Sequence, residues 1–118
     1  MTAAENSPAP VYLRLRAMLA SAILAGDFEE GEQLPSVRAF AALHGANPLT
    51  VAKAYQTLQD EGYVTVRRGV GMFVSEGARE RLCVQEREIF LSQTWPAVQA
   101  QIARLGLDAR TLIEPSLA

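Results

Sequence analysis

Residues 34–74 read LPSVRAFAALHGANPLTVAKAYQTLQDEGYVTVRRGVGMFV, and most of the signals that decide the fold lie in this stretch. Ser36 offers a hydroxyl N-cap to a short helix over residues 37–44, which a glycine follows. Asn47 can cap another helix, and the proline after it suits a first helical position, where the missing N–H would be unpaired in any case. The stretch therefore predicts two helices joined by a tight turn, the second running to about residue 61.

The segments on either side complete the order of elements. Apolar residues recur at helical spacing from Val11 to Ile23 and predict an earlier helix. After residue 62 the period changes to two, and a second apolar run over residues 72–74 follows the turn Gly69-Val70-Gly71, which predicts a β-hairpin. Three helices followed by a hairpin are the plan of a winged helix-turn-helix, whose third helix enters the major groove of DNA. A small α+β domain of another kind is the alternative.

Polar side chains are placed where such a fold contacts DNA. The apolar stripe of the third helix leaves four residues on or near its exposed side: Thr50, Lys53, Ala54 and Thr57. The start of this helix presents Asn47 and free backbone N–H groups, where a phosphate is favoured. In the hairpin, Arg67 and Arg68 directly precede a glycine turn that permits close approach to a phosphate or to the minor groove.

Composition limits the possible functions. The 118 residues are 49% apolar and 20% charged, with a net charge of −2 and a pI near 5.4. A basic domain is the usual footprint of DNA binding, so the prediction rests on the placement of the cations and not on their total. The single cysteine, Cys83, and the single histidine, His44, exclude a disulfide framework and a Cys/His zinc site. We expect no enzyme, no metal and no other cofactor.

Three parts of the chain are predicted. They are a loose N-terminal arm (residues 1–10), a winged helix-turn-helix DNA-binding domain (residues 11–75) and a helical tail (residues 76–118). The fold class is mainly α with a small β-hairpin. No apolar stretch approaches the roughly 20 residues that span a bilayer, and residues 1–10 lack the basic start and apolar run of a secretory signal. We therefore expect a cytoplasmic protein without a membrane helix.

Four ordered blocks of the sequence resemble the GntR-type bacterial transcription regulators. They are Leu34-Pro35-Ser36-Val37-Arg38, Asn47-Pro48-Leu49-Thr50-Val51-Ala52-Lys53-Ala54-Tyr55, Glu61-Gly62-Tyr63-Val64 and Arg68-Gly69-Val70-Gly71-Met72-Phe73-Val74. The resemblance covers residues 10–75, and the second block is similar to that of the YtrA-type subgroup. The resemblance implies DNA contacts at Arg38, at Asn47 and Thr50, and at Gly69.

The pattern and the resemblance together give a candidate DNA-binding set: Ser36, Arg38, Asn47, Pro48, Thr50, Lys53, Tyr55, Arg67, Arg68, Gly69 and Gly71. Tyr55 belongs either to the core or to a phosphate contact through its hydroxyl. Leu49 stands where the subgroup usually has asparagine, and it either meets a thymine methyl or packs against the helix over residues 37–44. Arg14 and Arg16 are either solvated or in contact with phosphates.

Residues 76–118 return to helical spacing. We expect a helix from about residue 78 to residue 93, another that starts at Trp95 and Pro96, and a final turn after Asp108. Their apolar stripe comprises Leu82, Ile89, Phe90, Trp95, Val98, Ile102 and Leu105. Helices this short cannot bury their apolar faces alone, so the stripe is predicted to be a homodimer interface, as the YtrA-type resemblance also implies. A ligand cage at Phe90 and Trp95 is the alternative, and Cys83 is expected to be a small buried residue.

The expected function is sequence-specific regulation of transcription. The protein would bind double-stranded DNA at an inverted repeat as a homodimer, and the resemblance implies a repressor of its own or a neighbouring operon, often one that encodes an ABC transporter. The sequence does not identify the operator or a small-molecule effector. The alternative is a winged-helix module that binds a protein partner instead of DNA, which the acidic pI favours.

Overall fold

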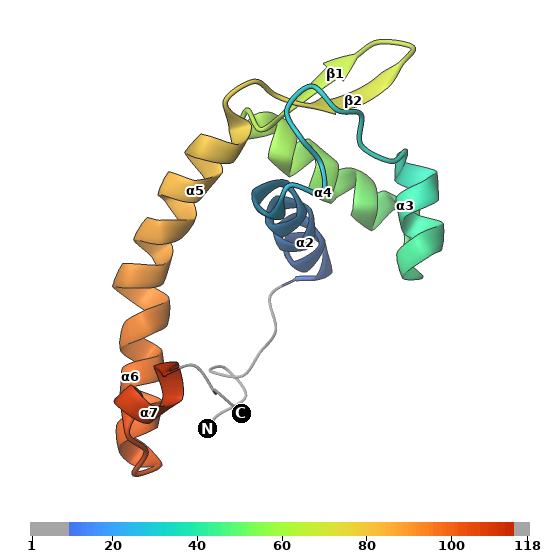
Figure 1. The fold of residues 1–118 in the computed structure, drawn as a ribbon. Coiled ribbons are helices and arrows are strands. Elements are labelled where there is room, and N and C mark those ends of the chain that lie inside the picture. The colour runs from blue at the N-terminus through green and yellow to red at the C-terminus, as the bar shows by residue number, and fades with distance from the viewer. Residues whose placement is uncertain (1–9, 115–118) are drawn as a thin grey trace. The chain divides into compact units, whose positions relative to one another are not determined.

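The computed structural model describes residues 10–114. They form two compact units, and the boundary between the units in the chain lies between Leu82 and Cys83. The first unit contains α2 (Val11–Ala25), α3 (Val37–His44) and α4 (Pro48–Asp60), followed by the antiparallel strands β1 (Val64–Arg67) and β2 (Gly71–Val74). In this unit α4 packs against α2, α3 and β1 (Figure 1). The winged helix-turn-helix that the sequence predicts is confirmed.

The start of α3 and the turn between α3 and α4 have the caps that the sequence predicts. The Ser36 hydroxyl oxygen accepts a hydrogen bond from the Ala39 N–H at 3.0 Å, and the Asn47 side-chain oxygen accepts one from the Leu49 N–H at 2.7 Å. Gly45 ends α3 with a φ of +62°, in the left-handed region that favours glycine. Gly45 and the Asn47 cap determine the path of the chain from α3 into α4.

A third segment lies alongside the hairpin. The Gly31 N–H donates to the Val74 carbonyl at 2.8 Å, and the Val74 N–H donates to the Glu32 carbonyl at 2.9 Å. The Leu34 N–H donates to the Met72 carbonyl at 2.8 Å. Residues 31–34 therefore cover the outer edge of β2 with backbone hydrogen bonds, which leaves that edge paired and not open.

The core of the first unit lies between α2 and α4. Leu19, Ile23, Val51 and Leu58 are 0–1% exposed there. Ala54 is 0% exposed, so the expectation that it lies near the exposed side of its helix is wrong. The stripe of α4 is wider than its large residues suggest because α2 and α3 cover two adjoining faces of the helix.

The first turn of α5 (Ala78–Ile89) belongs to this core. Ala78 and Leu82 are each 0% exposed within the core cluster of the first unit. Leu82 is therefore not available to a dimer interface, which corrects its place in the predicted stripe. Cys83, the next residue, is exposed, so the expectation of a small buried thiol is also wrong.

Polar contacts anchor the same turn. The Glu30 carboxylate accepts a hydrogen bond from the Gly77 N–H at 2.9 Å. Arg79 donates to the Leu24 carbonyl at 3.0 Å, near the end of α2, and Arg81 donates to the Gly62 carbonyl at 2.7 Å, just beyond the end of α4. Carbonyls in the last turn of a helix lack partners within that helix, so Arg79 supplies one at the end of α2, while Arg81 binds the loop that follows α4.

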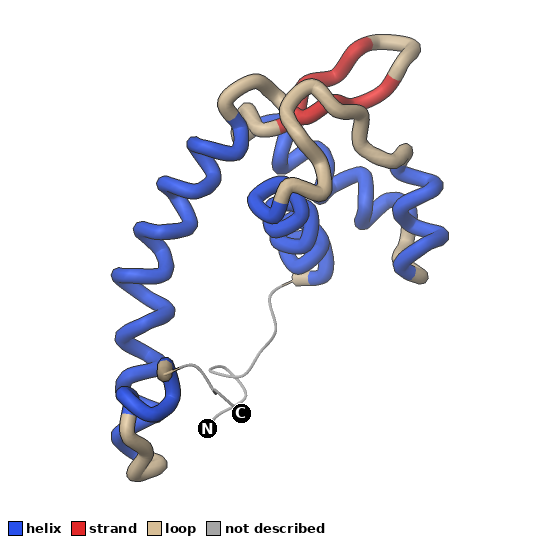
Figure 2. Tube along the Cα trace, viewed as in Figure 1, coloured by secondary structure: helices blue, strands red, loops and turns tan. Residues whose placement is uncertain are grey.

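In the second unit α5 continues into α6 (Trp95–Arg104) through a π-helical turn (Phe90–Thr94), without an intervening loop (Figure 2). The second helix starts at Trp95 as predicted, whereas the first ends at Ile89 and the π-helical turn joins the two. The Trp95 N–H donates to the Phe90 carbonyl, five residues back, and Pro96 follows without an N–H to donate. The wider turn thus ends where the proline interrupts the regular ladder. A short helix, α7 (Ala109–Ile113), is capped by Asp108 as predicted.

Within residues 10–114 there is no helix both long and apolar enough to cross a membrane.

Candidate nucleic-acid interface

The start of α4 presents polar groups on a fixed backbone. Asn47, Pro48 and Leu49 are exposed, and Thr50 is half-buried. The side-chain oxygen of Asn47 is used in the helix cap, so its NH₂ is the group that it can offer to a phosphate or a base. The positive end of the helix dipole adds to this preference for an anion.

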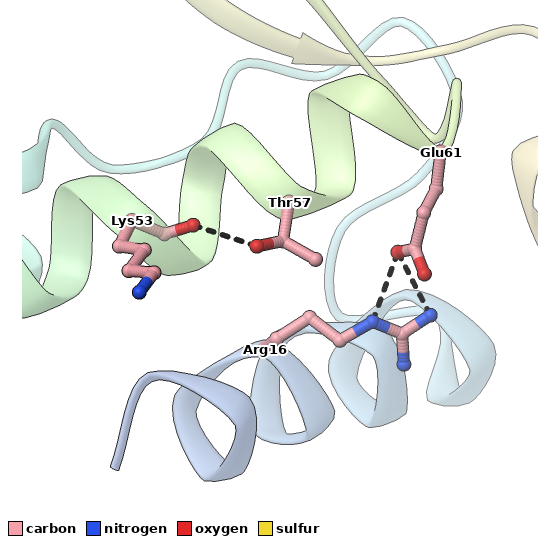
Figure 3. Close-up of polar contacts among 4 residues, drawn as sticks. All are labelled: Arg16, Lys53, Thr57 and Glu61. Carbon is pink, nitrogen blue, oxygen red and sulfur yellow. Dashed lines mark hydrogen bonds and ion pairs between the residues drawn. The ribbon is translucent and has the colours of Figure 1, made fainter. Parts of the chain in front are cut away.

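Lys53 lies on α4, and its ammonium is held by an aromatic ring of α2. The Nζ atom is 4.2 Å from the centroid of the Tyr12 ring, a cation–π contact that keeps the charge while restricting the side chain. The Thr57 hydroxyl donates to the Lys53 carbonyl at 2.9 Å, so this hydroxyl is engaged within the helix (Figure 3). Of the two side chains, Lys53 is therefore the better candidate for a DNA contact.

A charged contact joins α2 to the end of α4. The Arg16 Nε and a terminal nitrogen of its guanidinium each lie 2.9 Å from the same Glu61 carboxylate oxygen (Figure 3). The sequence left Arg16 open between a solvated charge and a phosphate contact. Its guanidinium instead forms an ion pair within the protein, at the end of α4 away from Asn47.

Ser36 and Arg38 lie at the start of α3. Both residues are exposed. The Ser36 oxygen accepts the capping bond, while its hydroxyl proton can still be donated to a phosphate. Arg38 follows two residues later on the same first turn, so the two side chains can serve one stretch of DNA backbone.

The tip of the hairpin is shaped by glycine and held by a residue that the sequence did not single out. Gly69 has a φ of +79° and Gly71 a φ of +147°. The Gln33 amide donates to the Val70 carbonyl at 2.8 Å, and a Cβ at Gly71 would collide with this amide. Both glycines are needed, because larger residues would strain the backbone or displace Gln33. Nothing in the local pattern around Gln33 indicates this contact, which bridges 37 positions.

The two arginines of the hairpin differ in their surroundings. The Arg67 guanidinium carbon is 4.1 Å from the centroid of the Phe73 ring, on the opposite strand. Arg68 is exposed at the turn itself. Arg67 is therefore ordered by its ring contact, and both arginines keep their full positive charge for a phosphate backbone.

A groove of about 560 Å³ separates α4 from the hairpin. Gln56 and Gln59 of α4 line one side, and residues 66–72 line the other. Gln56 donates to Asp60, one turn later, at 2.9 Å. These two glutamines were not predicted from the sequence, since only their place opposite the hairpin distinguishes them from other polar residues on the surface of a helix.

Tyr55 does not belong to the interface. The side chain is 2% exposed, and its hydroxyl donates to the Pro35 carbonyl at 2.6 Å. Its ring meets Phe40 edge-on, with the ring centroids 6.0 Å apart. Tyr55 therefore joins α4 to the segment before α3, and the phosphate contact proposed for it is corrected to a core contact.

Burial raises the pKa of the Tyr55 phenol from 10.0 to about 12. The phenol of the unfolded chain loses its proton at a lower pH than the phenol of the folded protein. The contribution of Tyr55 to stability is therefore fully present below pH 10 and is lost as the pH rises toward 12. The free energy of unfolding should fall by about 1 kcal/mol between pH 9 and pH 11 from this group. Urea unfolding of the protein and of Tyr55→Phe tests this. An equally steep fall in the variant would mean that other groups cause it.

Comparisons with known proteins agree with this geometry. The sequence model of the family described as "Bacterial regulatory proteins, gntR family" matches residues 11–74 of this chain. The HTH-type transcriptional repressor YtrA of Bacillus subtilis is 40% identical over 77 residues, which are 65% of this chain and 59% of YtrA. The chain thus matches less than two thirds of the length of that relative.

Solved structures share the fold. A putative transcriptional regulator of the GntR family from Bacteroides thetaiotaomicron superposes with a TM-score of 0.64 at 30% identity, over 87% of this chain and 89% of that one. The DNA-binding domain of AraR, solved in complex with operator ORX1, superposes with a TM-score of 0.56 at 24% identity, over 58% of this chain and 82% of that one. The relatives are named as regulators and not as enzymes. This chain belongs to the gntR family of bacterial regulatory proteins.

Proposed function

We propose that the protein represses transcription by binding an inverted-repeat operator as a homodimer. The observation that carries this proposal is the exposed, capped start of α4, with cations on α3, α4 and the hairpin of the same compact unit. The α4 helix enters the major groove, and the hairpin follows the flanking backbone. The protein acts in the cytoplasm on its own or a neighbouring operon, such as one that encodes an ABC transporter.

The candidate DNA contacts are those of the sequence prediction without Tyr55: Ser36, Arg38, Asn47, Pro48, Thr50, Lys53, Arg67, Arg68, Gly69 and Gly71. The name of YtrA as a repressor and the AraR complex with its operator support the assignment. The net charge of −2 does not oppose it, because the cations lie on the elements that face DNA while several acids lie in the loop after α2.

The homodimer is proposed from the second unit. Apolar side chains stay exposed or half-buried there: Ile89, Phe90, Trp95, Val98, Ile102 and Leu105. Phe90 and Trp95 stack with ring centroids 6.3 Å apart, and together they offer a broad aromatic surface. A two-fold axis through such an interface presents two α4 helices to half-sites about one helical turn apart. The predicted tail, residues 76–118, serves for dimerisation through its part after Leu82.

Fluorescence anisotropy tests the proposed function. The DNA comes from a selection of genomic fragments and from the region upstream of the gene, with a scrambled duplex of the same composition as the control. We expect preference for the selected sequence. A plot of the logarithm of the binding constant against the logarithm of the salt concentration should have a slope of about −5, as for roughly six neutralised phosphates. If no selected fragment binds above the scrambled duplex, the proposal fails, and the protein-binding winged-helix module takes its place.

Arg38→Ala should weaken operator binding by about 1–3 kcal/mol. Arg38 is exposed on the first turn of α3, so its removal deletes a charged contact without opening the core. The matched control is Arg87→Ala, which removes the same charge from an exposed position on α5. Anisotropy at one salt concentration measures both variants. Equal affinities for Arg38→Ala and the native protein would remove Arg38 from the interface.

A further inference from the structure

Leu49 is an apolar side chain in a polar setting. It is the second residue of α4 and is 82% exposed, although its neighbours in the helix start are Asn47 and Thr50. The sequence left open whether this leucine packs against α3. An exposure of 82% excludes that packing and leaves a large apolar group at the surface.

The backbone at Leu49 is fixed, so the side chain is displayed from a rigid position. Its N–H donates to the Asn47 side-chain oxygen at 2.7 Å, and Pro48 precedes it with a φ restricted by its ring. Residues at the start of a recognition helix are those that reach base edges in the major groove. Leu49 therefore meets DNA before the rest of α4 does, if α4 enters the groove as proposed.

The chemistry of the side chain selects its partner. Leucine neither donates nor accepts a hydrogen bond, so it gains nothing from a phosphate. It would also bury the N4 amine of cytosine or the N6 amine of adenine without a partner. The apolar group that standard base pairs display in the major groove is the C5 methyl of thymine. We propose that Leu49 is a specificity-determining residue that contacts a thymine methyl in each half-site, an inference that rests on the proposed function.

Replacing thymine by deoxyuridine tests the contact directly, because this change removes only the methyl group. Each thymine of a half-site in the selected operator is replaced in turn, symmetrically in both half-sites. At one position the native protein should lose about fourfold in affinity for each methyl, the value expected for burial of one methyl group. Leu49→Ala should bind the unmodified operator more weakly and should show no further loss at that position.

Leu43→Ala is the matched control. Leu43 lies near the end of α3 and is 76% exposed, so its substitution removes an equally exposed leucine from the same helix-turn-helix. This variant should keep the deoxyuridine effect of the native protein. Circular dichroism and thermal unfolding of the two variants verify that both remain folded.

The outcomes separate this proposal from the one on which it rests. Specific binding with no effect of deoxyuridine at any thymine, or an equal effect in Leu49→Ala, overturns the role of Leu49 while the regulator stands. Failure of the native protein to bind any selected DNA instead overturns the proposed function. A loss of the deoxyuridine effect in Leu43→Ala as well would overturn the assignment to Leu49 in particular.

Discussion

Val98→Glu is expected to dissociate the homodimer and to weaken operator binding by at least about 100-fold. Val98 lies on α6 and is 36% exposed in the single chain, within the apolar stripe proposed as the interface. A carboxylate at this place would be desolvated without a partner when two chains pair. Each half-site would then be bound separately, and the gain of roughly 10²–10⁴ that comes from linking two binding sites would be lost.

The measurement combines the molecular mass in solution with anisotropy on a full operator and on a single half-site. Ala100→Glu provides the control, because residue 100 is exposed and lies about 200° around the helix from residue 98. This control should stay dimeric and bind the full operator as the native protein does. If Val98→Glu is also dimeric and binds as tightly, the stripe on α6 is not the interface, and the dimer has to be sought elsewhere on the chain.

Leu82→Ala should lower the free energy of unfolding by about 3 kcal/mol, within the range of 2–5 kcal/mol for leucine-to-alanine changes in cores. Leu82 is 0% exposed in the core of the winged helix, so the substitution leaves a cavity that rigid neighbours fill only in part. Val84→Ala, two residues later and 61% exposed, should cost less than about 0.5 kcal/mol.

Urea unfolding at several protein concentrations measures these losses. A cavity in the core lowers stability at every concentration, whereas a lost interface lowers it only where the native protein is dimeric and has no effect when the protein is dilute. If Leu82→Ala lowers the free energy of unfolding only at concentrations at which the dimer forms, Leu82 belongs to the dimer interface, as the sequence pattern predicted. A uniform loss supports the correction made above.

The local signals predicted the elements well. Ser36 caps the start of α3, and Gly45 and Asn47 determine the turn that follows it. Their bonds reach residues no more than four positions away, so the sequence pattern alone locates α3 and α4. The hairpin follows from its glycine turn and the change of period for the same reason. Family resemblance then indicated the candidate DNA contacts, because these candidates are tied to the helix start and to the turn.

The errors concern contacts between distant segments. Periodicity puts Leu82 on an apolar face but does not tell whether that face meets its own domain or a second chain. Tyr55 lies on the inward side of α4, and only the position of Pro35 decides where its hydroxyl binds. The Gln33 contact with the hairpin depends on a segment 37 residues away. Such features arise from tertiary packing, which a pattern within one helix does not encode.

The anchored first turn of α5 has a consequence for chimeric regulators. Any foreign domain joined to this winged helix after Ser75 would remove Ala78 and Leu82 from the core, together with the arginines that bind the end of α2 and the loop that follows α4. A junction placed after residue 82 would keep all of these and give the grafted domain a helix of fixed starting direction. Recombination between regulators, natural or engineered, should therefore succeed at a crossover inside α5 and fail at the loop before it.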